Sequence, residues 1–378
     1  MDREGSSDGE CGFTEKNSSH SEGVSARALQ VLSWLGGEQR GESPAVWRDA
    51  ANEKAARRRA GPHRSGGCYR GSMIAVAGSV NMDLVARVPR IAAPGQTVLG
   101  HSFAQFHGGK GANQAVAAAR LGANVQFFGA VGRDAFGDAL QLGLRDEGID
   151  TQGLGRVDAP SGCALISVSD DGENAIAVLP GANALAPLPP HDWPGDVASG
   201  VARSASISWL LLQLEVPLAT CLAWAQAASA RGVRVMLNAA PMMVLPASLL
   251  ECVDTLVVNE GELAALVGAV ADIDTALAAA AGLGPQRVVV TLGAAGCRAV
   301  DADSLLHVAG TKVEVVDTTG AGDTFVGALA AGLDAGLTFD LALQRANVAA
   351  ALSCAVVGAR GGMPDRVALM KAQRSSFE

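Results

Sequence analysis

Hydrophobic and polar positions follow one another along most of the chain in blocks that predict strands followed by helices. The apolar run MIAVAGSV (73–80) predicts a short buried strand. Residues 108–123, GGKGANQAVAAARLGA, predict a glycine-rich entry into a helix that stops at Gly122, and NVQFFGAVG (124–132) predicts the next strand. An amphipathic helix is expected over 134–149, with Asp134 as its N-cap.

The same alternation continues through the second half of the chain. SISWLLLQL (206–214), VRVMLNAA (233–240), TLVVNE (255–260) and RVVVTLG (287–293) predict strands, and 217–232 and 261–268 predict helices. Strands that alternate with helices are typical of a mostly parallel sheet with helices on both faces. The sequence therefore predicts an α/β fold of three layers.

Two regions depart from this rhythm. Residues 84–107 carry no helix signal, and GCALISVSDDGENAIAVLP (162–180) predicts two strands around a DDGEN turn. We expect about 84–107 and 160–180 to form a small antiparallel β-sheet lid that excludes water from a site. Residues 1–72, rich in Ser, Gly, Glu and Arg, are expected to be a disordered extension, 73–370 the folded domain and 371–378 a tail.

Charge and cysteine content narrow the possible functions. The formal net charge is −9, and residues 73–378 hold 18 basic and 28 acidic residues, so nucleic acid is not an expected partner. The seven cysteines lack metal-ligand spacing, which favours a reduced cytoplasm over disulfides or zinc. No apolar run reaches the roughly 20 residues of a membrane span, so no membrane partner is expected.

Three glycine-rich stretches are candidates for phosphate binding. HGGKGANQ fails as a Walker loop, because Gly111 stands where Ser or Thr is needed and Ala104 where Gly is needed, and it fails as a dinucleotide fingerprint at Gln114. TLGAAG (291–296) reads more readily as a strand-ending turn. VEVVDTTGAGDTFVGALAAGL (313–333) predicts a strand, a turn and a helix whose free amides could hold an anion. Asp323 in that stretch is either the N-cap of the helix or a residue that takes part in the chemistry of the site.

GGKGANQAVAAARLGA and DTTGAGDTFVGAL together resemble the two signature segments of the ribokinase-like (PfkB-type) carbohydrate kinases. GSVNMD, LLLQLEVP, LNAAP, VNEGE and VTLGAAG follow the order of that family, and the resemblance covers about residues 73–370. It implies a ribokinase-like three-layer fold with a small β lid that also forms a homodimer. It further implies ATP-dependent phosphorylation of D-ribose at the 5-hydroxyl, giving ribose 5-phosphate.

The resemblance also implies a role for individual residues. Asp323 would be the catalytic base, beside an anion hole formed by Gly320, Ala321 and Gly322. The sugar would contact Asp323 and a polar set comprising Asn81, Asp83, Gly109, Lys110, Asn113 and Glu215. ATP would contact the Ala321–Gly322 amides and a second set comprising Asn259, Thr291, Gly293, Gly296 and Asn347.

Two ions are implied as well. Glu262 would help to organise hydrated Mg²⁺, and a K⁺ site would draw on Asp317, Thr319, Ser353, Val356, Gly358 and Gly362. Gly362 departs from the family pattern, since a serine hydroxyl usually faces K⁺ there, so this ion site is expected to be weaker, completed by water, or different in selectivity. Other substrates (deoxyribose, fructose, adenosine) and a catalytically silent sugar-binding regulator remain alternatives.

Overall fold

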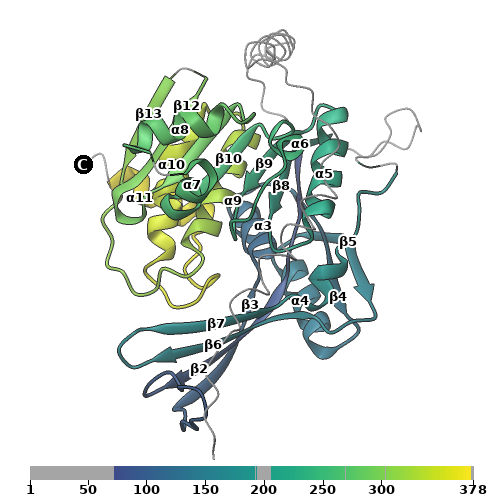
Figure 1. The fold of residues 1–378 in the computed structure, drawn as a ribbon, viewed down its shortest axis with the longest axis vertical. Coiled ribbons are helices and arrows are strands. Elements are labelled where there is room, and N and C mark those ends of the chain that lie inside the picture. Colours follow the sequence, from purple (N-terminus) through teal and green to yellow (C-terminus); the bar gives the residue numbers. More distant parts are fainter. Residues whose placement is uncertain (1–71, 192, 194–205, 269, 303, 376–378) are drawn as a thin grey trace, which may run out of the picture. The chain divides into compact units, whose positions relative to one another are not determined.

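The computed structural model describes residues 72–191, 193, 206–268, 270–302 and 304–375 (Figure 1). All of them belong to one of the two units into which the chain divides, residues 64–378. The expected extension at 1–72 thus lies outside the described residues, apart from Ser72.

A nine-stranded sheet in the order β13-β12-β11-β10-β9-β8-β1-β4-β5 forms the centre of this unit. Neighbouring strands from β11 to β5 are parallel, whereas β11–β12 and β12–β13 are antiparallel. The strand bounds are β1 Ser72–Ala77, β4 Val125–Gly132, β5 Asp150–Val157, β8 Ser206–Gln213, β9 Arg234–Asn238, β10 Thr255–Asn259, β11 Arg287–Thr291, β12 Gly296–Asp301 and β13 Ser304–Ala309.

Helices cover both faces of this sheet, as the alternating pattern predicts. On β1, Ile74 and Val76 face one hydrophobic core, and Ala75 and Ala77 face the other. The first core is closed by α3 (Lys110–Arg120), α4 (Ala135–Asp146), α9 (Ala321–Asp334) and α10 (Phe339–Ser353), and α11 (Arg366–Ser375) packs beside them. The second is closed by α5 (Leu218–Ala230), α6 (Ala247–Leu250), α7 (Glu260–Val267) and α8 (Ile273–Ala281). The three-layer α/β prediction is confirmed.

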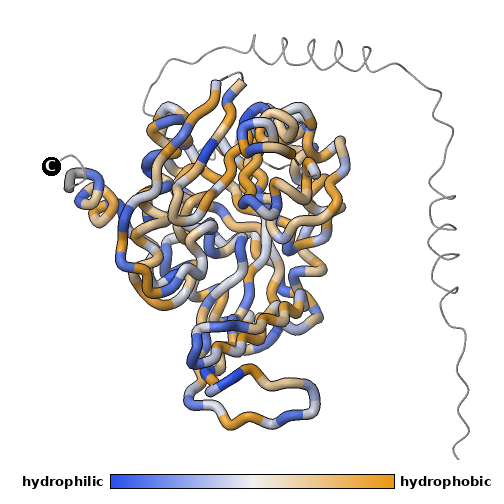
Figure 2. Tube along the Cα trace, turned by 60° about the vertical axis from the view of Figure 1, so that its left-hand side comes forward, coloured by the Kyte–Doolittle hydropathy of each residue, from blue (hydrophilic) through white to orange (hydrophobic). Residues whose placement is uncertain are grey.

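A separate four-stranded sheet has the order β3-β2-β6-β7 (Figure 1). Its strands are β2 Asn81–Val88, β3 Ser102–Gly108, β6 Gly162–Ser169 and β7 Asn174–Leu179. The predicted hairpin around DDGEN is present as the antiparallel pair β6–β7, while β2 and β6 are parallel. Hydrophobic segments run along this sheet, at the lower end of the view in Figure 2.

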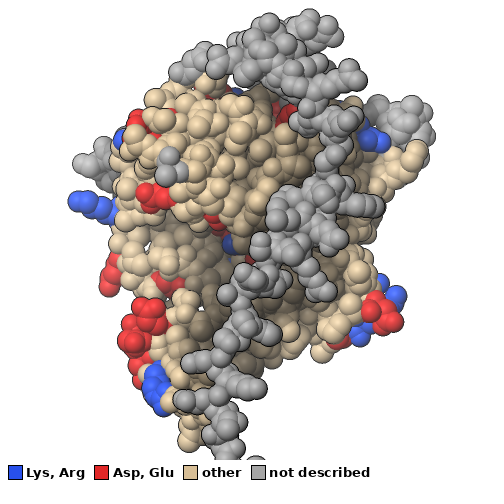
Figure 3. All heavy atoms as spheres, viewed as in Figure 1, with Lys and Arg blue, Asp and Glu red and all other residues tan. Residues whose placement is uncertain are grey.

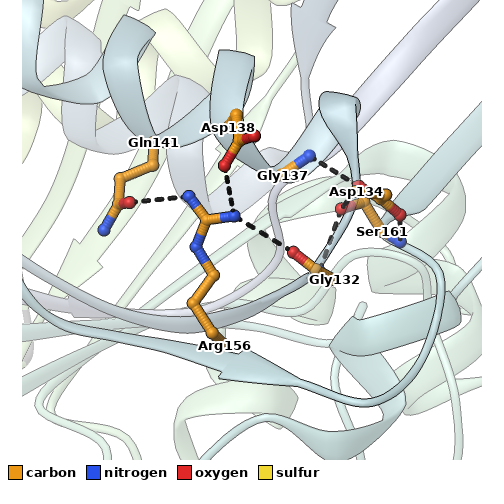
Figure 4. A network of polar contacts seen from close by, with 7 residues as sticks. All are labelled: Gly132, Asp134, Gly137, Asp138, Gln141, Arg156 and Ser161. Atoms are coloured by element: carbon orange, nitrogen blue, oxygen red, sulfur yellow. Dashed lines mark hydrogen bonds and ion pairs between the residues drawn. The ribbon is translucent and has the colours of Figure 1, made fainter.

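The start of α4 is tied to the small sheet through its cap (Figure 4). The Asp134 carboxylate accepts hydrogen bonds from the Gly137 amide, as the predicted N-cap, and from the amide and hydroxyl of Ser161, which precedes β6. Arg156 reaches the same turn, pairing with Asp138 at 2.7 Å. One carboxylate thus fixes both the N-terminus of α4 and the start of strand β6.

Two predictions at the level of elements need correction, and strand β5 was not predicted. VEVV (313–316) is not a strand: Val315 and Val316 are exposed, and the Val316 and Asp317 amides donate to the Cys354 carbonyl oxygen instead of to a sheet. The helix that follows starts at Ala321, so Asp323 lies inside it and Gly320 is its N-cap. Strand β5, with four polar and two glycine residues, gave no clear periodic signal in the sequence.

The described ranges also bear on the expectations about membranes, disulfides and nucleic acid. None of the helices there is both long and apolar enough to cross a membrane. The cysteines at 163, 221, 252, 297 and 354 are free thiols. On the face shown in Figure 3, the described Lys and Arg side chains are scattered and do not form a continuous basic patch.

Candidate active site

The predicted site residues gather at one edge of the main sheet, because they follow the carboxyl ends of parallel strands. Asn81 comes after β1, Glu215 after β8, Asn259 ends β10 and Thr291 ends β11. These strands are neighbours, and Asn259 pairs directly with Thr291. Open α/β sheets bind ligands at this edge, where the loops diverge.

Asp323 lies in the first turn of α9 and is 8% exposed. Its Oδ2 accepts a hydrogen bond from Asn113 Nδ2 at 3.0 Å, and its Oδ1 accepts one from Gln114 Nε2 at 3.0 Å. Burial raises the pKa of Asp323, while the charge of Lys110 and the two amide donors oppose that rise. The carboxylate is therefore held in one orientation by groups that favour its ionised form.

A chain of buried amides fixes the donor on Gln114. Gln213 Nε2 donates to Gln114 Oε1 at 2.6 Å, so the Gln114 amino group must face Asp323 and Asn238 Oδ1. Asn238 in turn donates to the Val257 carbonyl oxygen at 3.2 Å. Each side-chain amide has one donor side and one acceptor side. The backbone carbonyl of Val257 on β10 therefore sets the orientation of all three amides, those of Asn238, Gln114 and Gln213.

Asp83, on β2, brings a second carboxylate from the small sheet toward Asp323. Burial raises its pKa to about 6; the charge of Arg360 opposes the rise, and Glu215 and Asp323 add to it. Space for this carboxylate exists because its neighbour is Gly108: a Cβ there would lie 2.2 Å from Asp83 Oδ2. The carboxylates of Asp83, Asp323 and Glu215 thus act on one another electrostatically.

Glu215 and Lys110 are linked through the backbone. Glu215 Oε2 accepts a hydrogen bond from the Lys110 amide at 3.0 Å and another from the Ser79 hydroxyl. Burial raises the pKa of both Asp323 and Glu262, and the charge of Lys110 opposes the rise at each, so this cation acts on a residue of the predicted sugar set and on one of the predicted nucleotide side.

Asn81 is buried and oriented by a residue absent from the predicted set. Its Oδ1 accepts a hydrogen bond from Asn183 Nδ2 at 2.7 Å, and Asn183 also binds both backbone polar groups of Val80. Asn183 belongs to the short 3-10 helix η1 (Gly181–Leu185). The Asn81 amino group is thereby left to face other partners.

Three glycines around the site differ in whether a side chain would fit at their position. A Cβ on Gly109 (φ 86°) would lie 2.7 Å from the Val80 Cα, and one on Gly320 (φ 77°) would lie 2.6 Å from the Ala359 carbonyl oxygen. A Cβ on Gly322 would meet nothing within 4 Å. Open space therefore borders Gly322 at the start of α9, while the Ala321 amide donates to the Thr318 carbonyl oxygen at 3.2 Å.

Some residues predicted to bind the nucleotide also stabilise the local structure. Asn259 caps α7 in a capping box with Glu262, each side chain accepting from the other's backbone amide at 2.8 Å. Burial raises the pKa of Glu262, opposed by the Asn259 amide and by Lys110. Asn347 donates to the Ala309 carbonyl oxygen at 2.9 Å, which holds the start of the 310–316 segment against α10.

The loop after β11 is more open. Gly293 begins the 3-10 helix η3 (Gly293–Ala295), and a Cβ on it would meet nothing within 4 Å. Gly296 is different, since a Cβ there would lie 2.1 Å from the Val308 carbonyl oxygen. Thr291 donates to the Val258 carbonyl oxygen at 3.4 Å.

The predicted K⁺ residues form two neighbouring groups. Asp317 accepts hydrogen bonds from the Thr319 and Gly358 amides; partial burial of Asp317 opposes their effect, yet its pKa is lowered. Ser353 donates to the Ala350 carbonyl oxygen at 2.8 Å, and a Cβ on Gly362 would lie 2.0 Å from the Ser353 carbonyl oxygen. Val356 is exposed. In the described part of the chain, His, Cys, Asp and Glu side chains form no group of three or more suited to a metal.

Several site residues escaped the sequence analysis, although some carried a signal. Gln114 and Gln213 are polar residues within apolar helix and strand runs, where a buried polar side chain needs a partner. Arg360, whose Nε donates to Asn113 Oδ1 at 2.9 Å, gave no such signal, because its segment is rich in glycine and lacks periodicity.

Comparison with known proteins identifies the family of this chain. The model of the pfkB family carbohydrate kinases matches residues 72–366. The chain is 39% identical to the ribokinase of Haemophilus influenzae, over 78% of this chain and 95% of that one. It is 38% identical to the ribokinase of Lactococcus lactis, over 81% and 98%.

A solved structure adds a three-dimensional match. The structure of Arabidopsis thaliana ribokinase complexed with ribose and ATP has a TM-score of 0.71 and 32% identity, over 80% of this chain and 98% of that one. The predicted resemblance is thus confirmed by family model, sequence and fold. This chain belongs to the pfkB family of carbohydrate kinases, with a fold and site geometry in keeping with phosphoryl transfer to a sugar.

Proposed function

We propose that this protein phosphorylates D-ribose at its 5-hydroxyl with ATP, giving ribose 5-phosphate and ADP. The observation that carries the proposal is Asp323, buried in the first turn of α9 with both carboxylate oxygens held by amide donors, next to Gly322, which borders open space. Relatives named ribokinase support the choice of sugar, as does the Arabidopsis relative bound to ribose and ATP.

The polar residues fit a small sugar with several hydroxyls. Asp83 and Glu215 offer carboxylate acceptors, and Asn81 and Asn113 offer oriented amides. Several positioned polar groups discriminate between polyols far better than an apolar pocket does. We infer that ribose lies between these residues and Asp323.

In the proposed reaction, Asp323 accepts the proton of the 5-hydroxyl as that oxygen attacks the γ-phosphorus of ATP. The new P–O bond forms while the bond to the β–γ bridging oxygen breaks, and ADP leaves. The amide of Gly322 stabilises the charge on the transferred phosphoryl group, and that of Ala321 adds to this when it turns from the Thr318 carbonyl oxygen, to which it donates at 3.2 Å. A raised pKa suits Asp323 as a base near neutral pH, because the proton transfer is then closer to balanced.

ATP is proposed to lie over the ends of β10 and β11, near Asn259, Thr291 and Gly293, where Gly293 borders open space. Since the described acids form no three-residue metal group, Mg²⁺ would arrive with the nucleotide and be held largely through water, with Glu262 nearby. It would supply charge neutralisation for the phosphates.

We also propose that K⁺ activates the protein, but only weakly in this chain. The carboxylate of Asp317 is already bound to two backbone amides, and the Ser353 hydroxyl to a carbonyl. Gly362 adds no hydroxyl, and its backbone lies close to the Ser353 carbonyl. Backbone carbonyls and water would therefore supply most ligands, which predicts weak K⁺ dependence.

We also propose a homodimer formed through the lid. Cross-strand pairing places Asp83, Phe106 and Ala164 on one face of the small sheet, and Val178 and Ile176 continue that face on β7. Phe106, Ile176 and Val178 are exposed there. Covering this face with a second copy would bury apolar surface and screen Asp83 from water. A cytoplasmic location, with residues 73–370 as the catalytic domain, completes the proposal.

The test is a substrate panel followed by coupled ADP release. D-Ribose should give the highest kcat/KM among D-ribose, 2-deoxyribose, fructose and adenosine, and mass spectrometry should find the product phosphorylated at the 5-position. Higher kcat/KM with another acceptor would change the assigned substrate. If no acceptor stimulates ADP release while ribose still binds in calorimetry, the protein is a sugar-binding regulator.

A further inference from the structure

A partly buried arginine from the segment between α10 and α11 reaches the proposed sugar site. Arg360 donates through Nε to Asn113 Oδ1 at 2.9 Å and through Nη2 to the Gly108 carbonyl oxygen at 3.2 Å. Its partners thus come from the start of α3 and the end of β3, 247 and 252 positions away along the chain. Neither the proposed proton transfer nor the binding set above uses this residue.

The contact with Asn113 decides which side of that amide meets Asp323. Arg360 can only donate, so Asn113 must turn its oxygen toward Arg360 and its amino group toward Asp323. The amino group then donates to Asp323 Oδ2 at 3.0 Å. If the amide were turned over, two acceptor oxygens would face each other and the donor to Asp323 would be lost.

The charge of Arg360 also acts within a group of acids. Around Asp83 lie the carboxylates of Glu215 and Asp323 and the cation of Arg360. The charge of Lys110 also acts on Asp323. Burial and the two acids favour protonation of Asp83, and Arg360 opposes this. Burial lowers the pKa of Arg360 to about 10, so it remains a cation at neutral pH.

The backbone of Arg360 is itself held in place. Arg120 donates through Nη1 to the carbonyl oxygens of Arg360 at 2.6 Å and of Met363 at 3.0 Å. Arg120 is also paired with Glu147 at 2.6 Å. The guanidinium therefore projects from an anchored segment, as a group that must orient another side chain requires.

We propose that Arg360 is a positioning residue for phosphoryl transfer, which turns the Asn113 amide toward the base Asp323 and supplies the cation that faces the sugar-binding Asp83. This inference rests on the proposed function and adds to it a residue that acts through two others. A misplaced base lowers turnover more than it weakens ground-state binding, because alignment matters most in the transition state.

The test compares Arg360→Lys and Arg360→Gln with wild type. Arg360→Gln keeps a donor for Asn113 but removes the charge, so the acid limb of the pH profile of kcat/KM for the sugar should move to higher pH. Arg360→Lys keeps the charge but not the two-pronged geometry. It should leave the acid limb in place and lower kcat about tenfold or more, with KM for ATP little changed.

Arg133→Gln, an exposed arginine outside the site, is the matched control and should behave as wild type. Thermal melts establish whether each variant is folded; if Arg360→Gln does not fold, the Arg360→Lys comparison decides. A wild-type kcat in Arg360→Lys overturns the positioning role, as does an unshifted acid limb in folded Arg360→Gln. The variants are assayed on whichever sugar the wild type phosphorylates best, so a wrong sugar assignment appears in the wild-type panel and not in these ratios.

Discussion

Asp323 is the residue on which the proposed chemistry depends, and its surroundings explain why it is no ordinary helix cap. Gly320 already occupies the N-cap position, and both Asp323 oxygens accept from side-chain amides. A carboxylate buried in this way, with a raised pKa, is typical of a base and uncommon for a structural acid.

Asp323→Asn should lower kcat by about 10²- to 10⁴-fold, because general base catalysis contributes on that order. Ribose binding should persist, since the substitution keeps the volume of the side chain. Steady-state kinetics and calorimetry measure the two effects. Asp340→Asn, an exposed acid on α10, serves as the control, and near-normal turnover in Asp323→Asn would remove Asp323 from the role of base.

The sequence predicted only some of the residues that contact Asp323. Asn113 and Asp323 were predicted to share a site, and they do lie in contact. Gln114 was not singled out, although it binds the other oxygen of Asp323. Its polar side chain in an apolar run indicates that it needs a partner, but its partners Gln213 and Asn238 lie 99 and 124 positions away, so the local pattern could not identify them.

The N-terminus of α9 joins the site to the fold. Its two glycines, Gly320 and Gly322, are needed for different reasons. Gly320 has a left-handed φ and no room for a Cβ, whereas Gly322 borders open space. Folding therefore requires the first glycine, and we expect the phosphoryl group to require the second.

Gly320→Ala should lower the stability of the protein by about 1–2 kcal/mol or more, because a side chain there is strained and contacts the Ala359 carbonyl. Gly322→Ala should keep or slightly raise the melting temperature, since Ala favours a helix over Gly. It should nevertheless reduce kcat, because the methyl group enters the proposed anion cradle. Melts and kinetics on both variants check the contrast; equal effects on stability and activity in the two would contradict it.

The cap of α4 predicts a pH effect on stability. Partial burial of Asp134 would raise its pKa, but hydrogen bonds from Ser161 and Gly137 and the charge of Arg156 outweigh this and lower it. The folded pKa is thus below the unfolded value of about 3.9. The stabilisation is present above that value and is lost as the pH falls through the folded pKa.

Asp134→Asn retains a capping oxygen but does not titrate. Urea denaturation between about pH 5 and pH 2 should therefore show a shallower loss of stability in the variant than in wild type. Asp170→Asn, an exposed acid in the β6–β7 turn, is the control. Parallel curves for wild type and Asp134→Asn would show that the network in Figure 4 contributes no pH dependence.

At the scale of the whole molecule, the small sheet has an unusually apolar exposed face for a single chain. Ile176 is 56% exposed and Val178 is 51% exposed, on the face that also carries Asp83. Surface of this kind commonly marks an interface. The proposed dimer would place it against a second lid.

Ile176→Lys should shift the protein from dimer to monomer, because the interface would have to bury a charge without a partner. Light scattering after size exclusion, at several concentrations, gives the mass. Leu341→Lys, at an exposed position on α10, should remain dimeric. A monomeric wild type, or an Ile176→Lys variant that stays dimeric, would contradict the lid interface.

The sequence by itself determined the three-layer α/β fold, the separate small sheet and the two glycine-rich segments that identify the family. These are encoded locally, since strand and helix periodicities and glycine turns depend on neighbouring residues. It misjudged VEVV, whose β-branched residues favour a strand but whose amides bind the Cys354 carbonyl of a distant segment.

Only the tertiary structure decided how the site is oriented. The donor sides of Asn113 and Gln114 are set by Arg360 and by the amides of β8 and β9, which meet only when the sheet and the segment after α10 come together. The shared environment of Asp83, Glu215 and Asp323 has the same origin. The physical reason is that hydrogen-bond direction and charge coupling depend on distances in space, which periodicity along the chain does not encode.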